Sequence, residues 1–155
     1  MLIRAFEPGD LETLRRLTVE AFQGVSIDHN MEKRFGVIGD KDWRWRKARQ
    51  IDEDVSANAT GVFVAVAQAE IIGYVTTRVD REAGIGHIHN LAVAAAARGQ
   101  GLGRRLIEHA LAYFRGQGLS HAKIETLDQN SVGQHLYPAC GFVEVALQIH
   151  YLRKL

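Results

Sequence analysis

A glycine-rich segment in the second half of the chain has the composition of an anion-binding turn. Gly99, Gly101 and Gly103 alternate with bulkier residues and lead into an amphipathic run with helical periodicity. Glycines at the start of a helix leave several backbone N–H groups without partners, and the positive end of the helix dipole lies behind them. Such a turn suits a phosphate group. The sequence therefore predicts a phosphate-bearing ligand at this turn.

Two common phosphate-binding motifs do not fit the turn. A P-loop requires a lysine followed by Ser or Thr after the last glycine, but Arg104 and Arg105 follow Gly103. A dinucleotide-binding fingerprint requires a third small residue where this chain has Arg104, and its strand should begin a βαβ unit rather than come late in the chain. Hydrolysis of nucleoside triphosphates and dinucleotide binding are therefore disfavoured.

Two histidines, His87 and His89, share one face of an expected strand just before the turn. Imidazole has a reference pKa of about 6.5, so either ring can accept a proton near neutral pH. A pair of surface histidines and a metal site are the alternatives. The further histidines His109, His121 and His135 do not have metal-ligand spacing. We therefore expect no metal and keep a general base and a surface pair open.

An α/β scaffold is expected to position these residues. The order β-α-α-β-β-β-α-β-α-β-β predicts a mixed twisted sheet of about six to seven strands flanked by helices. On the second helix, Trp45, Ala48, Ile51 and Val55 form the expected apolar stripe.

The poorly patterned residues 25–39 suggest a lid, with a weak helix at 30–35. The expected strands are 2–6, 62–67, 71–79, 86–93, 122–127, 142–145 and 147–152, and the main helices are 10–23, 40–58, 101–115 and 131–140.

Length and composition indicate one globular domain. The chain has 155 residues, 46% of them hydrophobic and 24% charged. A net charge of +1 argues against nucleic-acid binding. A single cysteine, no secretory leader and no long apolar span favour a cytoplasmic protein that does not enter a membrane.

Three motifs in register resemble one known family. Arg98, Gly101 and Gly103 fill the pattern Q/R-x-x-G-x-G/A, and the strand at 91–93 reads L-A-V five residues before the arginine. Downstream, residues 137–142 read Y-P-A-C-G-F and fit the pattern Y-x-x-x-G-F, with Asn130 seven residues before the tyrosine. Together they resemble the GNAT superfamily of N-acetyltransferases, which bind acetyl-coenzyme A. The resemblance implies a GNAT fold and acetyl-CoA as co-substrate.

The resemblance also implies where acetyl-CoA would bind. Backbone amides of the glycine-rich turn would hold the pyrophosphate, and the strand at 91–93 would run beside the pantetheine arm, with an amide near Val93 as the oxyanion donor. Asn130 would bind the arm or cap the following helix. The expected cofactor-binding residues are Leu91, Ala92, Val93, Arg98, Gly99, Gln100, Gly101, Leu102, Gly103, Arg104, Asn130 and Tyr137.

Catalytic roles follow from the same resemblance. Tyr137 is the expected acid, because a phenol is protonated at neutral pH and can give its proton to a departing thiolate. His87 occupies the position at which many relatives carry a carboxylate, and His89 lies next on that face, so both are candidate bases. Cys140 has no base beside it in sequence, so we interpret it as a small hydrophobic residue rather than a nucleophile.

The resemblance divides the single domain of residues 1–155 into acceptor-side helices (1–61), an acetyl-CoA-binding core (62–145) and a C-terminal strand (146–155). The W-R-W-R segment at 43–46 fits an acidic or aromatic acceptor or the contact of a homodimer. A small-molecule or peptide amine is the expected acceptor, and its identity stays open. A non-catalytic acyl-CoA-binding sensor or regulatory module is the alternative function.

Overall fold

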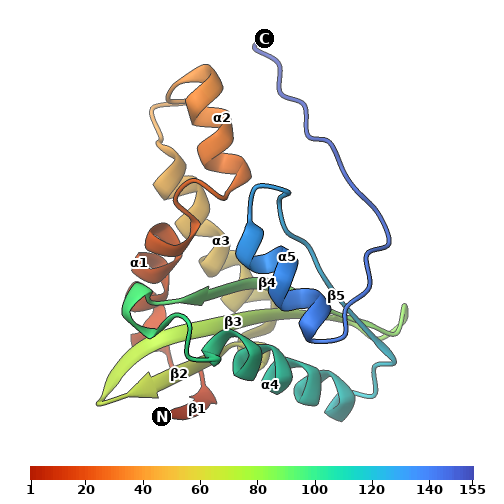
Figure 1. Cartoon of the computed structure of the whole chain (residues 1–155). Coiled ribbons are helices and arrows are strands. Elements are labelled where there is room, and N and C mark those ends of the chain that lie inside the picture. Colours follow the sequence, from red (N-terminus) through yellow and green to blue (C-terminus); the bar gives the residue numbers. More distant parts are fainter.

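Five strands form one mixed sheet in the computed structural model, which describes residues 1–155 (Figure 1). Their spatial order is the same as their order in the chain, β1-β2-β3-β4-β5. Neighbouring strands from β1 to β4 pair antiparallel, whereas β4 and β5 pair parallel. The predicted α/β fold with a mixed sheet is confirmed. The strands are β1 (Leu2–Ala5), β2 (Phe63–Ala67), β3 (Glu70–Asp80), β4 (Ile85–Val93) and β5 (His121–Ile124).

Helices lie on both faces of the sheet (Figure 1). Helix α4 packs on one face, and α1 and α3 pack on the other. No helix of the chain combines the length and the apolar character that crossing a membrane requires. The helices are α1 (Leu11–Phe22), α2 (Ile27–Phe35), α3 (Trp43–Asn58), α4 (Leu102–Gly116) and α5 (Ser131–Ala139), with short 3₁₀ turns at Pro8–Asp10, Ala59–Gly61 and Ala95–Ala97.

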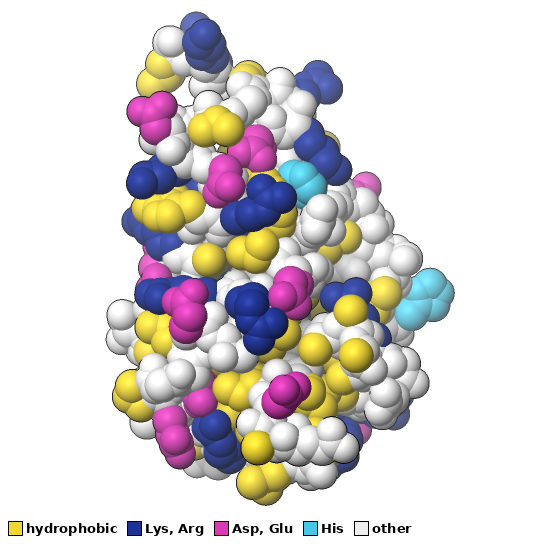
Figure 2. Space-filling model, turned by 90° about the vertical axis from the view of Figure 1, so that its left-hand side faces the viewer, with side chains coloured by type: hydrophobic (Ala, Val, Ile, Leu, Met, Phe, Trp, Pro, Cys, Tyr) yellow, Lys and Arg dark blue, Asp and Glu magenta, His cyan; other side chains and the backbone are white.

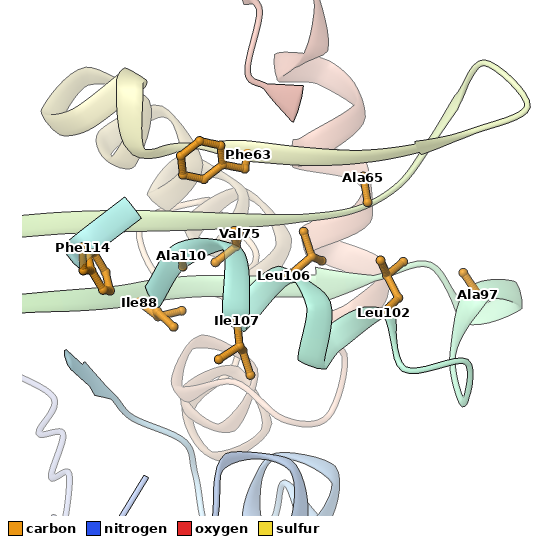
Figure 3. Close-up of a cluster of buried hydrophobic side chains, with 10 residues drawn as sticks. All are labelled: Phe63, Ala65, Val75, Ile88, Ala97, Leu102, Leu106, Ile107, Ala110 and Phe114. Carbon is orange, nitrogen blue, oxygen red and sulfur yellow. The ribbon is translucent and has the colours of Figure 1, made fainter. Parts of the chain in front are cut away.

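Helix α4 is fixed to the sheet by a continuous apolar stripe (Figure 3). Complete burial of one such side chain contributes about 2 kcal/mol, so the stripe supplies much of the stability of this layer. Contact is closest where the ring of Phe114 covers Gly86, since a Cβ at Gly86 would lie 2.4 Å from that ring. This packing holds the end of α4 over the start of β4. The buried residues of the stripe are Leu102, Leu106, Ile107, Ala110 and Phe114.

Helix α3 buries a different stripe from the one expected. Trp45, a member of the expected apolar stripe, is 42% exposed, whereas Trp43 is buried. The buried residues are Trp43, Lys47, Ile51 and Asp54, so two charged side chains face the interior. The apolar pattern led to the wrong face because burial on this helix includes charged residues that the sheet supplies with partners.

Two further expectations differ from the structure. The segment at 25–39 contains a complete helix, α2, which Ser26 caps by accepting a hydrogen bond from the His29 amide, so three α-helices rather than two precede β2. The strands expected at 142–145 and 147–152 are absent, and the sheet therefore has five strands. Residues 143–155 make no backbone hydrogen bond and extend away from the body of the protein (Figure 1). Alternating apolar residues permit a strand, but a ladder forms only beside a partner strand.

Candidate functional site

The glycine-rich turn before α4 presents backbone amides to solvent. Gly99 and Gly101 have φ values of +73° and +76°, a region that favours glycine. The six consecutive amides from Gly99 to Arg104 have no acceptor within the chain, and Gly101 caps α4 without a side-chain hydrogen bond. A Cβ at Gly99 or Gly101 would meet no atom within 4 Å, so the surface of the turn is open. This geometry fits the pyrophosphate of coenzyme A, as predicted for an anion at a helix N-terminus.

Two arginines connect the turn to its neighbours. Arg98 Nε donates to the Val93 carbonyl oxygen at 3.1 Å, which ties the turn to the end of β4. Arg104 Nη2 donates to the Ala139 carbonyl oxygen at 2.9 Å, which ties α4 to the end of α5. Both side chains therefore brace the turn, whose six backbone amides have no acceptor within the chain.

β4 and β5 separate beside the turn. Their parallel pairing ends at Ile88 and Ile124, whereas β4 continues to Val93. The last five residues of β4 consequently have no strand on their β5 side. A ligand that enters here can add its own amides to the strand edge, as the pantetheine arm was expected to do at Leu91 and Val93.

A β-bulge interrupts β4 at His89. Thr77 pairs with Ile88 and Thr76 with Asn90, so His89 has no partner residue on β3. A bulge redirects a side chain and is common beside active sites. The His87 and His89 rings lie edge to face with their centroids 5.2 Å apart. The structure therefore brings the two candidate bases together.

Each of these histidines contacts a carboxylate. His87 Nε2 contacts Glu125, which lies just beyond β5 and is 65% exposed. Burial lowers the pKa of His87 below its usual value, although the Glu125 carboxylate opposes the shift, so the neutral ring is favoured near neutral pH. His89 Nδ1 contacts Asp54 Oδ1 at 2.5 Å, and Asp54 is fully buried. No group of three potential metal ligands surrounds the pair.

Tyr137 lies on α5 with its ring largely packed against the α4 side of the core. Burial raises the pKa of its phenol to about 12. The hydroxyl makes no hydrogen bond within the chain, so it remains available to a ligand. Asn130 is the predicted cap of α5: its Oδ1 accepts from the Gly133 amide at 3.2 Å, and its Nδ2 donates to Thr126 Oγ1 at 2.9 Å. The cap is confirmed, and a contact with the coenzyme stays a prediction.

The expected acceptor side is formed by α1, α2 and α3, and Figure 2 shows this face with basic and acidic side chains interspersed. The Trp43 ring stacks on His29 with centroids 4.5 Å apart, so this tryptophan is part of the packing between α2 and α3. Asp28 on α2 accepts from Gln50 at 3.1 Å, and burial raises the pKa of its carboxyl. Asn30 donates to Gln129 at 3.0 Å, which joins α2 to the loop before α5.

Comparison with known proteins agrees with this geometry. The family model described as Acetyltransferase (GNAT) family matches residues 12–142. The chain belongs to this family. Mycothiol acetyltransferase of Streptomyces avermitilis is 30% identical over 149 residues, which cover 96% of this chain and 45% of the relative. The chain thus spans about half the length of the curated relatives it matches.

Solved structures share the fold. PH1933 from Pyrococcus horikoshii OT3 has a TM-score of 0.73 at 21% identity, with coverage of 95% of this chain and 91% of that protein. The paiA N-acetyltransferase of Thermoplasma acidophilum, crystallised with coenzyme A, has a TM-score of 0.70 at 19% identity, with coverage of 89% and 86%. Acetyl-CoA is the co-substrate of the family, and the open amides of the turn fit its pyrophosphate.

The sequence did not reveal the buried polar residues behind the histidines. Asp54 on α3 contacts His89. Thr76 and Arg78 on β3 and Asn90 on β4 donate hydrogen bonds to Asp54. One signal was present: Trp43, Lys47, Ile51 and Asp54 follow helical spacing, so a buried Trp43 would place both charged residues on the inner face.

Proposed function

We propose that the chain transfers the acetyl group of acetyl-CoA to a primary amine by direct attack within a ternary complex. The observation that carries the proposal is the arrangement of one continuous segment, β4 to α4. It carries two histidines at its start, an open strand edge in its middle and six unpaired amides at its end. Membership of an acetyltransferase family supports the same reaction.

Binding would rest on the backbone of the turn. Amides from Gly99 to Arg104 would donate to the pyrophosphate, and each hydrogen bond to a charged group contributes about 1.5–3 kcal/mol before ordering costs. Arg98 and Arg104 would add positive charge while they brace the turn. The open edge of β4 at Leu91 and Val93 would align the pantetheine arm. This arrangement would hold the thioester near the β4 bulge.

The chemistry needs a base, an oxyanion donor and an acid. The bound thioester supplies an electrophilic carbonyl carbon. A neutral ring of His87 or His89 would take a proton from the acceptor ammonium, so that the freed nitrogen lone pair forms the new C–N bond while the C–S bond breaks. The second proton of that nitrogen would pass to the departing thiolate. An amide near Val93 would stabilise the developing negative charge on the carbonyl oxygen.

Tyr137 would donate to the leaving sulfur. A phenol with a pKa of about 12 is protonated at every pH at which the protein would work. It is also a weaker acid than a thiol, whose reference pKa is about 8.5, so complete transfer to the thiolate is uphill. We therefore propose that the Tyr137 hydroxyl stabilises the sulfur by a hydrogen bond as the C–S bond breaks.

A small-molecule amine is the acceptor class we favour. One relative at 30% identity is named mycothiol acetyltransferase, after a small molecule. The carboxylates of Asp28 and Glu32 on α2 have the sign that attracts an ammonium group. An acceptor that carries its amine on a compact polar body would suit this side of the protein.

Thermal-shift titration with acetyl-CoA, followed by release of free thiol across a panel of amines, tests the proposal. Gly101→Val should weaken binding, because valine is strained at a φ of +76°. Gly116→Ala at the far end of α4 is the matched control, because a Cβ there meets no atom within 4 Å and its φ is not positive. Failure of acetyl-CoA to shift the melting temperature would contradict the proposal. Binding without turnover on any amine would instead support an acyl-CoA-binding module.

A further inference from the structure

Asp54 is a fully buried carboxylate that four side chains approach as hydrogen-bond partners. Oδ2 lies 2.6 Å from Thr76 Oγ1 and 2.8 Å from Asn90 Nδ2. Oδ1 lies 2.7 Å from Arg78 Nη2 and 2.5 Å from His89 Nδ1. A charged group in the interior is costly unless it is paired and hydrogen-bonded, and here both conditions are met. The site is therefore built around an ionised Asp54.

The protonation state of this carboxylate decides the tautomer of His89. Hydrogen bonds from His89, Thr76 and Asn90 outweigh burial and lower the pKa of Asp54 to about 2. An ionised carboxylate only accepts hydrogen bonds, so the imidazole nitrogen that faces it must carry a proton. Asn90 Nδ2 is 3.4 Å from the same ring nitrogen and 2.8 Å from the carboxylate, so its hydrogen bond belongs to Asp54. The network assigns the Nδ1–H tautomer and leaves a lone pair on Nε2.

The neighbouring histidine is held less firmly. His87 contacts Glu125 through Nε2, and the Glu125 side chain is 65% exposed, compared with 0% for Asp54. Exposed ion pairs stabilise little because water competes for both partners. His89 is also fixed by the bulge, while its own side chain is 32% exposed and so remains accessible. Of the two rings, His89 is the one whose free nitrogen has a defined identity and direction.

We propose that His89 is the base of the acetyl transfer and that Asp54 is its positioning residue, an inference that rests on the proposed function. His89 Nε2 takes one proton from the acceptor ammonium, whose nitrogen then forms the C–N bond as the C–S bond breaks. The second proton that this nitrogen loses passes to the departing thiolate, which leaves as the free thiol. Asp54 stabilises the imidazolium that results. The proton leaves His89 to water after the products separate. Asp54 thus acts through His89 and touches no reacting atom.

Other charged groups also lie around His87 and His89. Arg78 on β3 binds the same carboxylate oxygen, and Lys47 on α3 donates to Asn90 Oδ1 at 2.8 Å. Burial lowers the pKa of Lys47 to about 8, so it remains largely cationic at neutral pH. His87 lies beside His89, with Glu125 behind it. Asp54 is therefore the carboxylate that contacts His89, and Arg78 and Lys47 are the cations held by the same network.

The tautomer of His89 can be measured without any turnover. In ¹⁵N-labelled protein above the titration of the ring, long-range ¹⁵N–¹H correlations should show a proton on Nδ1 and none on Nε2 of His89. Spectra of His89→Gln assign the signals. A predominant Nε2–H tautomer would overturn the proposal, even if the protein acetylates amines. If the spectra show the expected tautomer but the protein acetylates none of the amines, the proposed function is wrong.

Kinetics of Asp54→Asn test the positioning role. An amide at this place permits the wrong tautomer, so kcat should fall about 100-fold or more, by analogy with general-base catalysis. The KM for acetyl-CoA should stay within about twofold, because the turn is unchanged.

Glu125→Gln is the matched control, because it makes the same chemical change at the partner of His87. Its kcat should fall by less than about threefold. Thermal melts confirm that both variants fold. A folded Asp54→Asn protein with the kcat of the parent, or equal losses of kcat in the two variants, would overturn the proposal. If Asp54→Asn does not fold, the tautomer measurement on the unaltered protein decides.

Discussion

The glycine-rich turn and the histidine site use the chain in opposite ways. The turn works through six neighbouring amides of one short segment, Gly99 to Arg104. The histidine site joins side chains from α3, β3 and β4, and Asp54 and His89 are 35 positions apart in the sequence. Backbone function depends on local conformation, whereas side-chain function depends on tertiary packing. The two regions should therefore respond differently to substitution, and the following predictions exploit that difference.

The largest expected effect is at the histidine site. His89→Ala should lower kcat by about 100-fold or more, because a general base contributes about 10²–10⁴-fold. His87→Ala should lower kcat by less than about tenfold, since its ring is held only by an exposed carboxylate. Steady-state rates at saturating acetyl-CoA on one amine compare the two. Equal losses of kcat in the two variants would show that the buried Asp54 gives His89 no larger part in the reaction than His87 has.

The charge of Asp54 should also appear in acid stability. Its pKa is lowered from 3.8 to about 2, so its contribution is present above about pH 4 and is lost as the pH falls through about 2. The contribution at neutral pH is about 2 kcal/mol. Urea unfolding at about pH 5 and about pH 2 should show a larger loss in the parent protein than in Asp54→Asn. Parallel losses would contradict an ionised Asp54.

Substitution in the turn should affect binding alone. Gly101→Ala places a Cβ at a φ of +76°, which costs about 1–2 kcal/mol and corresponds to an affinity for acetyl-CoA about five- to thirtyfold weaker. The rate at saturating acetyl-CoA should change little. Calorimetric titration measures the affinity, with Gly116→Ala as the control. If Gly101→Ala lowers kcat and leaves the affinity for acetyl-CoA unchanged, the turn takes part in the chemical step and the prediction is wrong.

Tyr137→Phe should lower kcat far less than His89→Ala. Because transfer of the phenolic proton to the thiolate is uphill, loss of the hydroxyl should lower kcat by only about tenfold, below the range of an efficient acid. The KM for acetyl-CoA should be nearly unchanged, since the turn is intact. Thiol release after rapid mixing measures the effect. A rate equal to that of the parent would remove Tyr137 from the mechanism.

The difference between the two regions also explains what the sequence could predict. Glycine spacing and helical periodicity are local features of the sequence. Such features predicted the turn, the strand before it and the cap at Asn130. The role of Asp54 could not be predicted in this way, because it depends on the face that α3 turns toward the sheet. The apolar pattern favoured the face with Trp45, and only the burial of Trp43 revealed the other.

The chain beyond Phe142 shows the same limit. Val143, Val145 and Leu147 alternate with other residues as in a strand, yet each is more than 80% exposed and none belongs to a ladder. Alternation describes an extended conformation, whereas a strand also requires a neighbour with unpaired backbone groups. Local pattern therefore determines the shape of this segment and leaves its pairing undetermined.

A crystal structure of the complex with coenzyme A tests the central claim most directly. The account predicts pyrophosphate oxygens within about 2.7–3.2 Å of amides between Gly99 and Arg104, the pantetheine arm along the open edge of β4, and the sulfur on the side of the β4 bulge that His89 faces. A pyrophosphate bound elsewhere, or a sulfur remote from β4, would contradict it.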